Sequence, residues 1–267
     1  MTLRNILLNN SSFTFEQNVF CQKEIDNLNA FEKNYINLRE REHRVYSDEV
    51  VRNLPAIAES HALRKEWLIR KITMKKLVEH FKKRNYKTLI LELGCGNGWL
   101  CHHLAISLNA EILGLDINET ELLQGAKLFG ATQNLSFICA DVFTVDLKSQ
   151  SFDFILLASS IQYFSNLKRL ISRVLELLKP SGEIHIVDSP IYTSTIKANE
   201  AKARSLDYFN SRGVPEMANN YFHHLMVDLK SFNHQVLFMP HSLVSLFKRK
   251  ILRIPQGIFP WILIKHN

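Results

Sequence analysis

The stretch that decides the fold is residues 88–99, which read Thr-Leu-Ile-Leu-Glu-Leu-Gly-Cys-Gly-Asn-Gly-Trp. Residues 89–93, with one carboxylate among them, form the short apolar run that is typical of a strand buried on both faces. Gly94, Gly96 and Gly98 follow at alternate positions, where they allow positive φ and leave no Cβ in the way of a ligand. Apolar residues after the last glycine recur at helical spacing. These patterns predict a strand, a glycine-rich turn and a helix.

A glycine-rich turn between a strand and a helix presents free backbone N–H groups and the positive end of the helix dipole, so it favours an anion. The fingerprint of dinucleotide-binding proteins places its third glycine five positions after the first, but Trp99 stands at that position here. The spacing therefore argues against a nicotinamide oxidoreductase. A tight turn with a purely structural role can have the same glycine pattern. The neighbouring segments must therefore show whether this turn binds a ligand.

The pattern Gly-x-Gly-x-Gly resembles motif I of the class I S-adenosylmethionine (SAM) methyltransferases. In that family the acidic residue two positions before the first glycine, here Glu92, helps to hold the amino acid end of the cofactor. The resemblance implies a SAM site that includes Glu92 and the turn residues Gly94, Cys95, Gly96 and Gly98.

A second strand is predicted at residues 111–117, and Asp116 near its end lies about 20 residues after Gly94. The two oxygens of a carboxylate can accept hydrogen bonds from both hydroxyls of a ribose. We therefore predict that Asp116, together with the following Ile117, contacts the cofactor. The alternative interpretation is an ordinary exposed Asp at a strand end.

A third strand is predicted at residues 135–140, and Asp141 and Val142 follow it. At the corresponding position of the family, the carboxylate accepts from the exocyclic amine of adenine and the next backbone N–H donates to a ring nitrogen. One acceptor and one donor are what the edge of adenine requires. The resemblance therefore assigns Asp141 and Val142 to adenine.

The segment 151–164 has an apolar run that ends in small residues, including Ala158, which leave room beside a methyl donor. With the predicted helix at 167–178 and the strand after it, this segment resembles the fourth and fifth strands of small-molecule SAM methyltransferases. The resemblance covers residues 86–192. It implies an α/β fold with a Rossmann-like, seven-stranded methyltransferase sheet and an N-terminal helical extension.

The two ends of the chain are placed around this core. Residues 1–85 are expected to form the helical extension, which serves as a lid, although the polar residues 1–18 should be loosely ordered. Residues 86–267 are expected to form the SAM-binding methyltransferase domain. Strand-like runs at 234–239 and 259–264, separated by a basic helical segment, are expected to pair as an antiparallel hairpin at the sheet edge.

The composition is that of an ordinary globular protein, with 267 residues of which 46% are hydrophobic. The four cysteines show no paired spacing for a metal, which favours reduced thiols, a cytoplasmic location and no metal centre. The N-terminus is too weakly apolar for a signal peptide, and no stretch reaches the roughly 18 apolar residues of a membrane span.

Positive charge is concentrated in residues 64–87, which hold ten Lys or Arg against two Glu, whereas the whole chain has a net charge of +7. A basic helix of this kind can meet nucleic acid, an acidic carrier or an anionic lipid. Apolar residues between the charges, such as Trp67 and Phe81, favour the simpler interpretation of a solvated face on an amphipathic helix. An RNA methyltransferase that uses this helix is an alternative function, although the chain lacks the Asn-Pro-Pro-Tyr or Asp-Pro-Pro-Tyr box of amino-methylating nucleic acid enzymes.

Methyl transfer from a sulfonium is an in-line displacement, so the protein mainly aligns the acceptor and excludes water. A hydroxyl or carboxyl acceptor benefits from a base, and a histidine suits this task. His223 and His224 are candidate bases because they follow the fifth strand, and Tyr163 is a candidate for orienting the acceptor. The leading function is a SAM-dependent methyltransferase acting on a small-molecule, lipid-like or carrier-bound acceptor. A SAM-binding scaffold that has lost transfer is a further alternative.

Overall fold

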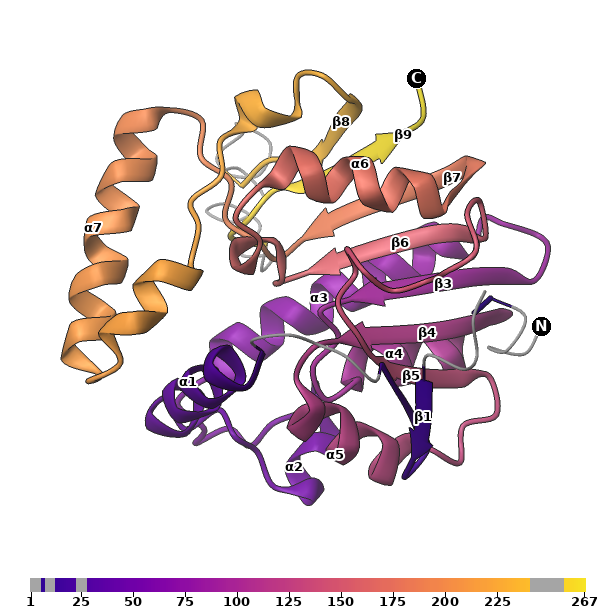
Figure 1. Cartoon of the computed structure of the whole chain (residues 1–267), viewed down its shortest axis with the longest axis horizontal. Coiled ribbons are helices and arrows are strands. Elements are labelled where there is room, and N and C mark those ends of the chain that lie inside the picture. Colours follow the sequence, from indigo (N-terminus) through magenta and orange to yellow (C-terminus); the bar gives the residue numbers. More distant parts are fainter. Residues whose placement is uncertain (1–5, 8–12, 23–27, 241–256) are drawn as a thin grey trace.

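The computed structural model describes residues 6–7, 13–22, 28–240 and 257–267, and a nine-stranded sheet runs through this part of the chain (Figure 1). The strand order is β1-β2-β5-β4-β3-β6-β7-β9-β8. The five central strands are parallel: β5 (Leu135–Cys139), β4 (Ala110–Asp116), β3 (Thr88–Leu93), β6 (Phe152–Ala158) and β7 (Leu178–Val187). Their carboxyl ends therefore meet at one edge of the sheet, and the predicted α/β fold is confirmed.

The sequence of β3 explains its central position. All six of its residues are buried, and it pairs with β4 on one side and with β6 on the other. Leu89 and Leu91 belong to the core on one face of the sheet, whereas Ile90 belongs to the core on the opposite face. A strand covered on both faces needs apolar side chains in both directions, which is why its sequence is almost continuously apolar.

Helices cover both faces of the parallel strands, and further helices lie beyond the strand ends. The α-helices are α1 (Leu28–Arg41), α2 (Asp48–Asn53), α3 (Arg64–Phe81), α4 (Trp99–Ser107), α5 (Glu119–Phe129), α6 (Leu167–Leu177) and α7 (Thr195–Ser211). Residues of α6 pack into the core on one face, and residues of α3, α4 and α5 pack into the core on the other. In α6, Leu167, Leu170, Ile171 and Val174 are buried along a single stripe, so the predicted helical face is confirmed. None of the helices in the described segments has an apolar stretch long enough to cross a membrane.

The C-terminal strands β8 (Asn233–Phe238) and β9 (Trp261–Lys265) form an antiparallel hairpin, and β9 pairs with β7. This arrangement confirms the predicted terminal hairpin at the sheet edge. Pro260 stands immediately before β9, where its missing N–H interrupts no ladder. The predicted basic helical segment between the two strands lies largely outside the described residues.

The N-terminal segment adds two strands that the sequence analysis did not predict. β1 (Phe13–Glu16) and β2 (Val19–Gln22) form a hairpin whose turn residues, Gln17 and Asn18, have φ of 48° and 68°. Because β2 pairs in parallel with β5, the hairpin extends the predicted seven-stranded sheet, which β3 to β9 form, to nine strands.

The prediction that residues 1–18 are loosely ordered is wrong for residues 13–18. The apolar side chains at the ends of this hairpin are anchored on both faces of the sheet, since Phe13 belongs to one core and Val19 to the other. The polar composition of the segment concealed these two anchors.

The predicted N-terminal helices are present, and α1 and α7 both lie beyond the carboxyl ends of the parallel strands (Figure 1). A 3-10 helix, η4 (Pro215–Asn220), packs against both of them. Leu38 of α1, Phe209 of α7 and Met217 of η4 share a small separate core. These elements therefore cover the edge of the sheet at which the carboxyl ends of the parallel strands meet.

A buried polar cluster joins β7 to α3 and β9. Glu183 Oε2 lies 2.8 Å from His80 Nε2 and 3.2 Å from His185 Nε2, and Trp261 Nε1 donates to His185 Nδ1 at 2.9 Å. Since that Nδ1 accepts a hydrogen bond, the proton of the neutral imidazole is on Nε2 and points at the carboxylate. The three ligand-type atoms lie within 4.8 Å of one another, as in a metal site. However, this proton and the Lys265 ammonium, 3.1 Å from Glu183, already satisfy the carboxylate, so we assign the cluster a structural role.

Acidification should weaken the fold through His185. Burial lowers the pKa of His185 to about 4, whereas a histidine in the unfolded chain titrates near about 6.5. The neutral imidazole therefore stabilises the fold above about pH 6.5, and this contribution is lost as the pH falls toward about 4. In His185→Gln, which keeps one donor and one acceptor, the melting temperature should fall less steeply between these pH values. The exposed control His43→Gln should keep the steep dependence, and an equally steep fall in both variants would contradict the assignment.

Candidate cofactor and acceptor site

The glycine-rich turn leaves β3 at the carboxyl edge of the sheet, and Gly94, Gly96 and Gly98 all have positive φ. A Cβ on Gly94 would lie 2.5 Å from Ser160 Cβ, and a Cβ on Gly98 would lie 2.4 Å from the Phe137 ring. Both distances are much shorter than a van der Waals contact, so only glycine fits at these two positions. Gly98 is also the N-cap residue of α4, which begins at Trp99, so the predicted strand, turn and helix are present.

Asp116, at the end of β4, ties this turn to the neighbouring strand. Its Oδ2 accepts from the Gly96 amide at 2.7 Å, and its Oδ1 accepts from the Asn118 amide at 2.9 Å. Each carboxylate oxygen has about two lone pairs, so each keeps the capacity for one further donor. Burial raises the pKa of Asp116, and the amide hydrogen bonds oppose this rise. Two oxygens with spare capacity, side by side, suit a vicinal diol.

Asp141 and Val142 follow β5 at the same edge, and with Asp116 and Ile117 they line a cavity of about 330 Å³. Asp141 Oδ1 accepts from the Phe143 amide at 3.0 Å. This contact holds the carboxyl group in place and leaves its second oxygen for an external donor. The cavity therefore offers an acceptor at Asp141 for a flat, hydrogen-bonding ring.

Carboxyl groups crowd the inner part of the cleft. Glu92 is 3% exposed, and Cys101 Sγ donates to its Oε2 at 2.9 Å. Burial raises the pKa of Glu92 to about 8, and the nearby Asp116 adds to the rise. Burial and Asp116 likewise raise the pKa of Glu121, on the first turn of α5, to about 7. A cation bound among these three groups would relieve their mutual repulsion.

A second, smaller cavity of about 100 Å³ adjoins the glycine turn. Nine of the ten predicted cofactor residues line this cavity or the larger one beside it: Glu92, Gly94, Cys95, Gly96, Asp116, Ile117, Asp141, Val142 and Ala158. Gly98 is the exception: it lines neither cavity and is the N-cap residue immediately before α4. The structure thus brings the predicted cofactor residues together along one cleft at the carboxyl ends of β3, β4, β5 and β6.

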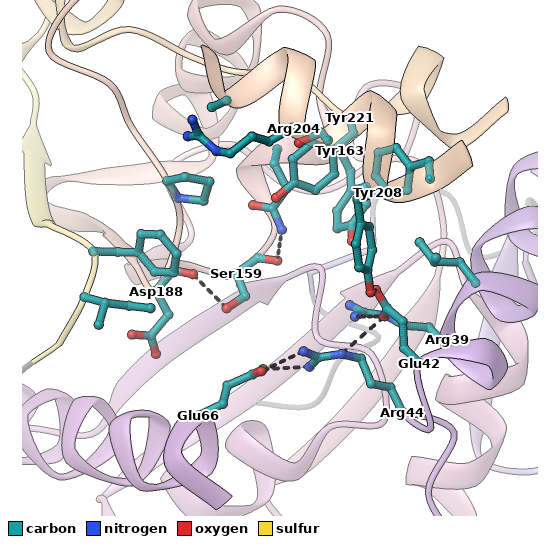
Figure 2. A pocket seen from close by; sticks show the side chains of 18 of the residues that line it. Arg39, Glu42, Arg44, Glu66, Ser159, Tyr163, Asp188, Arg204, Tyr208 and Tyr221 are labelled. Atoms are coloured by element: carbon teal, nitrogen blue, oxygen red, sulfur yellow. Dashed lines mark hydrogen bonds and ion pairs between the residues drawn. The ribbon is translucent and has the colours of Figure 1, made fainter. Parts of the chain in front are cut away.

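A third cavity, of about 570 Å³, lies beside this cleft, with walls from α7 and from the ends of β6 and β7 (Figure 2). Tyr163, Tyr208 and Tyr221 contribute an aromatic wall. Ser159 lines all three cavities, and Asp188 lines the third cavity and the smaller cofactor cavity. The cofactor cleft and the third cavity therefore adjoin at Ser159 and Asp188.

Ser159 and Asp188 follow the neighbouring strands β6 and β7, and both have positive φ, 57° and 50°. Ser159 Oγ donates to the Asp188 carbonyl oxygen at 2.9 Å, and Thr73 Oγ1 donates to Asp188 Oδ1 at 2.9 Å. Left-handed backbone is unfavourable for residues with a Cβ and is concentrated at functional sites. Burial raises the pKa of Asp188. A carboxyl group with one oxygen held by Thr73 therefore stands where the two spaces meet.

The structure separates the three predicted catalytic residues. Tyr163 lines the third cavity. His224 is 6% exposed, and its Nε2 lies 3.0 Å from the Ile161 carbonyl oxygen. His223 Nε2 lies 3.0 Å from Ser205 Oγ, and neither histidine is among the residues that line the cavity. Tyr163 thus lines both the third cavity and the larger cofactor cavity, whereas His223 and His224 line neither of them.

Sequence reasoning missed several residues of the site: Asp188, Glu121, Arg39, Arg44 and Arg204. A signal existed for Asp188, because it follows a buried strand just as Asp141 does. Arg39 belongs to α1 and Arg44 follows it, and no local pattern indicates which part of a sheet such a segment covers. Their position becomes visible only in the folded chain.

Comparison with known proteins agrees with this geometry. Residues 90–182, from β3 into β7, match the model of a family described as a methyltransferase domain. The chain carries a class I SAM-dependent methyltransferase domain. Relatives of this domain include a malonyl-[acyl-carrier protein] O-methyltransferase of Priestia megaterium, which is 30% identical over 101 residues, covering 38% of this chain and 36% of that protein. A phosphoethanolamine N-methyltransferase of Triticum aestivum is 31% identical over 109 residues, covering 39% of this chain and 21% of that protein.

The chain spans about a third or less of the length of these curated relatives. Solved structures extend the likeness of the fold. A geranyl diphosphate C-methyltransferase of Streptomyces coelicolor A3(2) superposes with a TM-score of 0.55 at 12% identity, covering 78% of this chain and 84% of that chain. A plantazolicin methyltransferase superposes with a TM-score of 0.55 at 18% identity, covering 90% of this chain and 98% of that one. These structures support the methyltransferase fold over most of the described residues.

Replacing Asp116 should weaken cofactor binding. Asp116→Asn keeps the size of the side chain but turns one accepting oxygen into a donor, so one hydroxyl contact is lost. We expect the affinity for S-adenosylhomocysteine (SAH), measured by calorimetry, to fall by about 1 to 3 kcal/mol. The exposed control Asp146→Asn should bind SAH like the unmodified protein. An unchanged dissociation constant in folded Asp116→Asn would refute the ribose assignment.

Proposed function

We propose that the protein is an enzyme that transfers the methyl group of SAM to a small-molecule, lipid-like or carrier-bound acceptor in the cavity of about 570 Å³. The observation that carries the proposal is the shared wall, since Ser159 and Asp188 line both this cavity and the cofactor cleft. In-line transfer requires the two reacting atoms to approach within about 3 to 3.5 Å. Adjoining spaces for donor and acceptor support such an approach.

The residues of the cleft divide by the part of SAM that each suits. We propose that the amino acid end of SAM is held by Glu92, Gly94, Cys95, Gly96 and Gly98. We propose that its nucleoside and sulfur are contacted by Asp116, Ile117, Asp141, Val142 and Ala158. When bound, SAM supplies an electrophilic methyl group on a positively charged sulfur. The buried carboxyl groups around the cleft complement a cationic ligand, which supports this choice of cofactor.

We assign the proton-accepting role to Asp188. In transfer to a hydroxyl or amine, the acceptor atom bonds to the methyl carbon as the carbon–sulfur bond breaks, and the acceptor must release its proton. Asp188 is suited to receive it at Oδ2, because Thr73 holds Oδ1. Tyr163 is proposed to orient the acceptor from the cavity wall. His223 and His224 are the alternative bases, and Asp188 is preferred because it lines the cavity.

Residues 1–85 are proposed to form an N-terminal extension of the methyltransferase domain, residues 86–267, and within this extension α1 and the residues that follow it are proposed to act as a lid. In support, Arg39 and Arg44 line both the acceptor cavity and the smaller cofactor cavity, and Tyr35 lines both cofactor cavities. The four cysteines are free thiols, which supports the proposed cytoplasmic location.

The names of the relatives favour a small acceptor over RNA. They include malonyl-[acyl-carrier protein], phosphoethanolamine and geranyl diphosphate methyltransferases, which between them modify O, N and C atoms. Within the basic segment, Trp67, Leu77 and Phe81 are buried, and Arg70 pairs with Glu66 at 2.8 Å. Much of α3 therefore serves the core and the cavity wall, which argues for a role in the fold rather than in binding nucleic acid.

Calorimetric titration with SAH, followed by an acceptor screen that measures release of homocysteine, tests the proposed function. We expect micromolar SAH binding and turnover with a small or carrier-bound acceptor. Binding without turnover on any acceptor would support the scaffold alternative, and turnover on RNA alone would support the RNA alternative. Absence of SAH binding in a folded sample would refute the cofactor assignment.

The role of Asp188 predicts a separation of binding from turnover. Asp188→Asn cannot take a proton, so kcat with a hydroxyl or amine acceptor should fall by about 100-fold or more. The SAH dissociation constant should stay within about 3-fold, because the nucleoside contacts are unchanged. Asp207→Asn, on the exposed side of α7, is the control and should keep full turnover. Full activity in Asp188→Asn would rule out this base.

A further inference from the structure

Charge is distributed unevenly around the acceptor cavity. Its lining includes five cationic side chains, Arg39, Arg44, Lys65, Arg70 and Arg204, and three carboxyl groups, Glu42, Glu66 and Asp188. The first question is which of these charges neutralise one another. A ligand would meet only those that remain.

Glu66 is fully engaged. Arg44 donates to both of its oxygens, each bond being 2.7 Å long, and Arg70 lies 2.8 Å from one of them. A bidentate contact of this kind fixes the planes of both groups. Glu66 therefore has little capacity left to meet a cationic ligand.

Glu42 is occupied in the same way. Its Oε2 lies 3.2 Å from Arg39 and 3.2 Å from Arg44, and Tyr208 donates to its Oε1 at 2.7 Å (Figure 2). Together with Glu66 and Arg70, these residues form one chain of alternating charges, with three cations to two anions. The chain itself keeps a positive excess.

Asp188 acts on the reacting end of the acceptor. Thr73 donates to its Oδ1, and in the proposed reaction its Oδ2 receives the acceptor's proton. As a carboxylate, Asp188 offsets only the single positive charge that the chain of alternating charges keeps, so the charges of Lys65 and Arg204 are not neutralised by it.

Lys65 and Arg204 are the remaining charges. Neither side chain forms a hydrogen bond or an ion pair with any other residue in the described part of the chain, and both are exposed. They come from different elements, Lys65 from α3 and Arg204 from α7. Figure 2 shows Arg204 across the cavity from Glu66, and Lys65 immediately precedes Glu66 in α3.

Aromatic rings form one wall of the acceptor cavity. Tyr163 and Tyr221 meet edge to face at 5.7 Å between ring centroids, and Phe209 packs on Tyr221 at 5.6 Å. Such a wall favours an acceptor with an apolar or unsaturated body.

From this geometry we infer that the acceptor is an amphipathic anion. Its carboxylate or phosphate is attracted into the cavity by the unneutralised charges of Lys65 and Arg204, and its apolar or aromatic body lies against the tyrosine wall. The inference rests on the proposed function, because it names the substrate class of the same site. It assigns Lys65 and Arg204 as specificity residues, distinct from the groups at the reacting centre. Guanidinium and ammonium groups both bind anionic oxygens, and the fork of Arg204 suits a planar carboxylate or a phosphate.

Matched probes test this class directly. Full-length protein saturated with SAH would be titrated calorimetrically with 4-hydroxycinnamate, with 4-hydroxycinnamamide and with 4-hydroxybenzyl phosphate. We expect the acid, the phosphate or both to bind at least about ten-fold more tightly than the neutral amide, and the tighter of the two identifies the anionic group. Equal or tighter binding of the amide, or no binding of either anion to the SAH-saturated protein, would overturn the inference.

Variants connect the anion preference to the two cations. Arg204→Gln and Lys65→Gln should each weaken the better anionic probe by about five-fold or more, while the dissociation constants for SAH and for the amide stay unchanged. Lys202→Gln on α7 and Lys75→Gln on α3 are exposed controls outside the cavity lining and should bind the anion normally. An equal effect of the control variants would show general charge attraction and overturn the assignment. Failure of the SAH titration itself would refute the proposed function instead, so the two failures are distinguishable.

Discussion

The site depends on one steric constraint, the close packing of the turn after β3. The turn passes so near Ser160 and Phe137 that no side chain fits at Gly94 or Gly98. This closeness lets the Gly96 amide reach Asp116 on the next strand, at 2.7 Å. Because a backbone group and a carboxylate from two different strands are locked together, the floor of the cleft is preformed. A rigid floor lowers the entropy that a flexible nucleotide ligand must lose on binding.

The same edge of the sheet carries a second unusual backbone feature. The residues that follow the neighbouring strands β6 and β7, Ser159 and Asp188, both have left-handed backbone conformations. Holding Ser159 and Asp188 in this region costs roughly 1 to 3 kcal/mol each. The hydrogen bonds that Ser159 makes to the carbonyl groups of Asp188 and Val187 help to hold it there. A strained pair between two cavities is consistent with a backbone selected for the direction of its side chains, and a relaxed strand end would aim the carboxyl group elsewhere.

The elements that followed local rules were predictable, and the residues placed by remote packing were not. Apolar runs in the sequence predict the buried strands. Because these strands are parallel, their carboxyl ends meet at one edge of the sheet, so the positions of Asp116 and Asp141 could be predicted from the sequence. The direction of a side chain in an irregular segment follows no such rule. His223 and His224 follow β7 in sequence, yet their rings turn toward Ser205 and the Ile161 carbonyl. Arg44 reaches the cavity only because α1 docks beyond the strand ends. The hairpin β1–β2 was missed because each strand has only four residues and its turn reads as a polar loop.

That hairpin has a consequence for the order in which the chain assembles. Val19 pairs with Phe137, about 120 residues away in the sequence, so β2 has no ladder to join until β5 is in place. During synthesis the hairpin emerges before β5 and must wait until β5 has been made. An isolated two-stranded hairpin is at best marginally stable in water. Its docking is therefore a late step, and the edge of β5 stays open to other strands until the hairpin closes it.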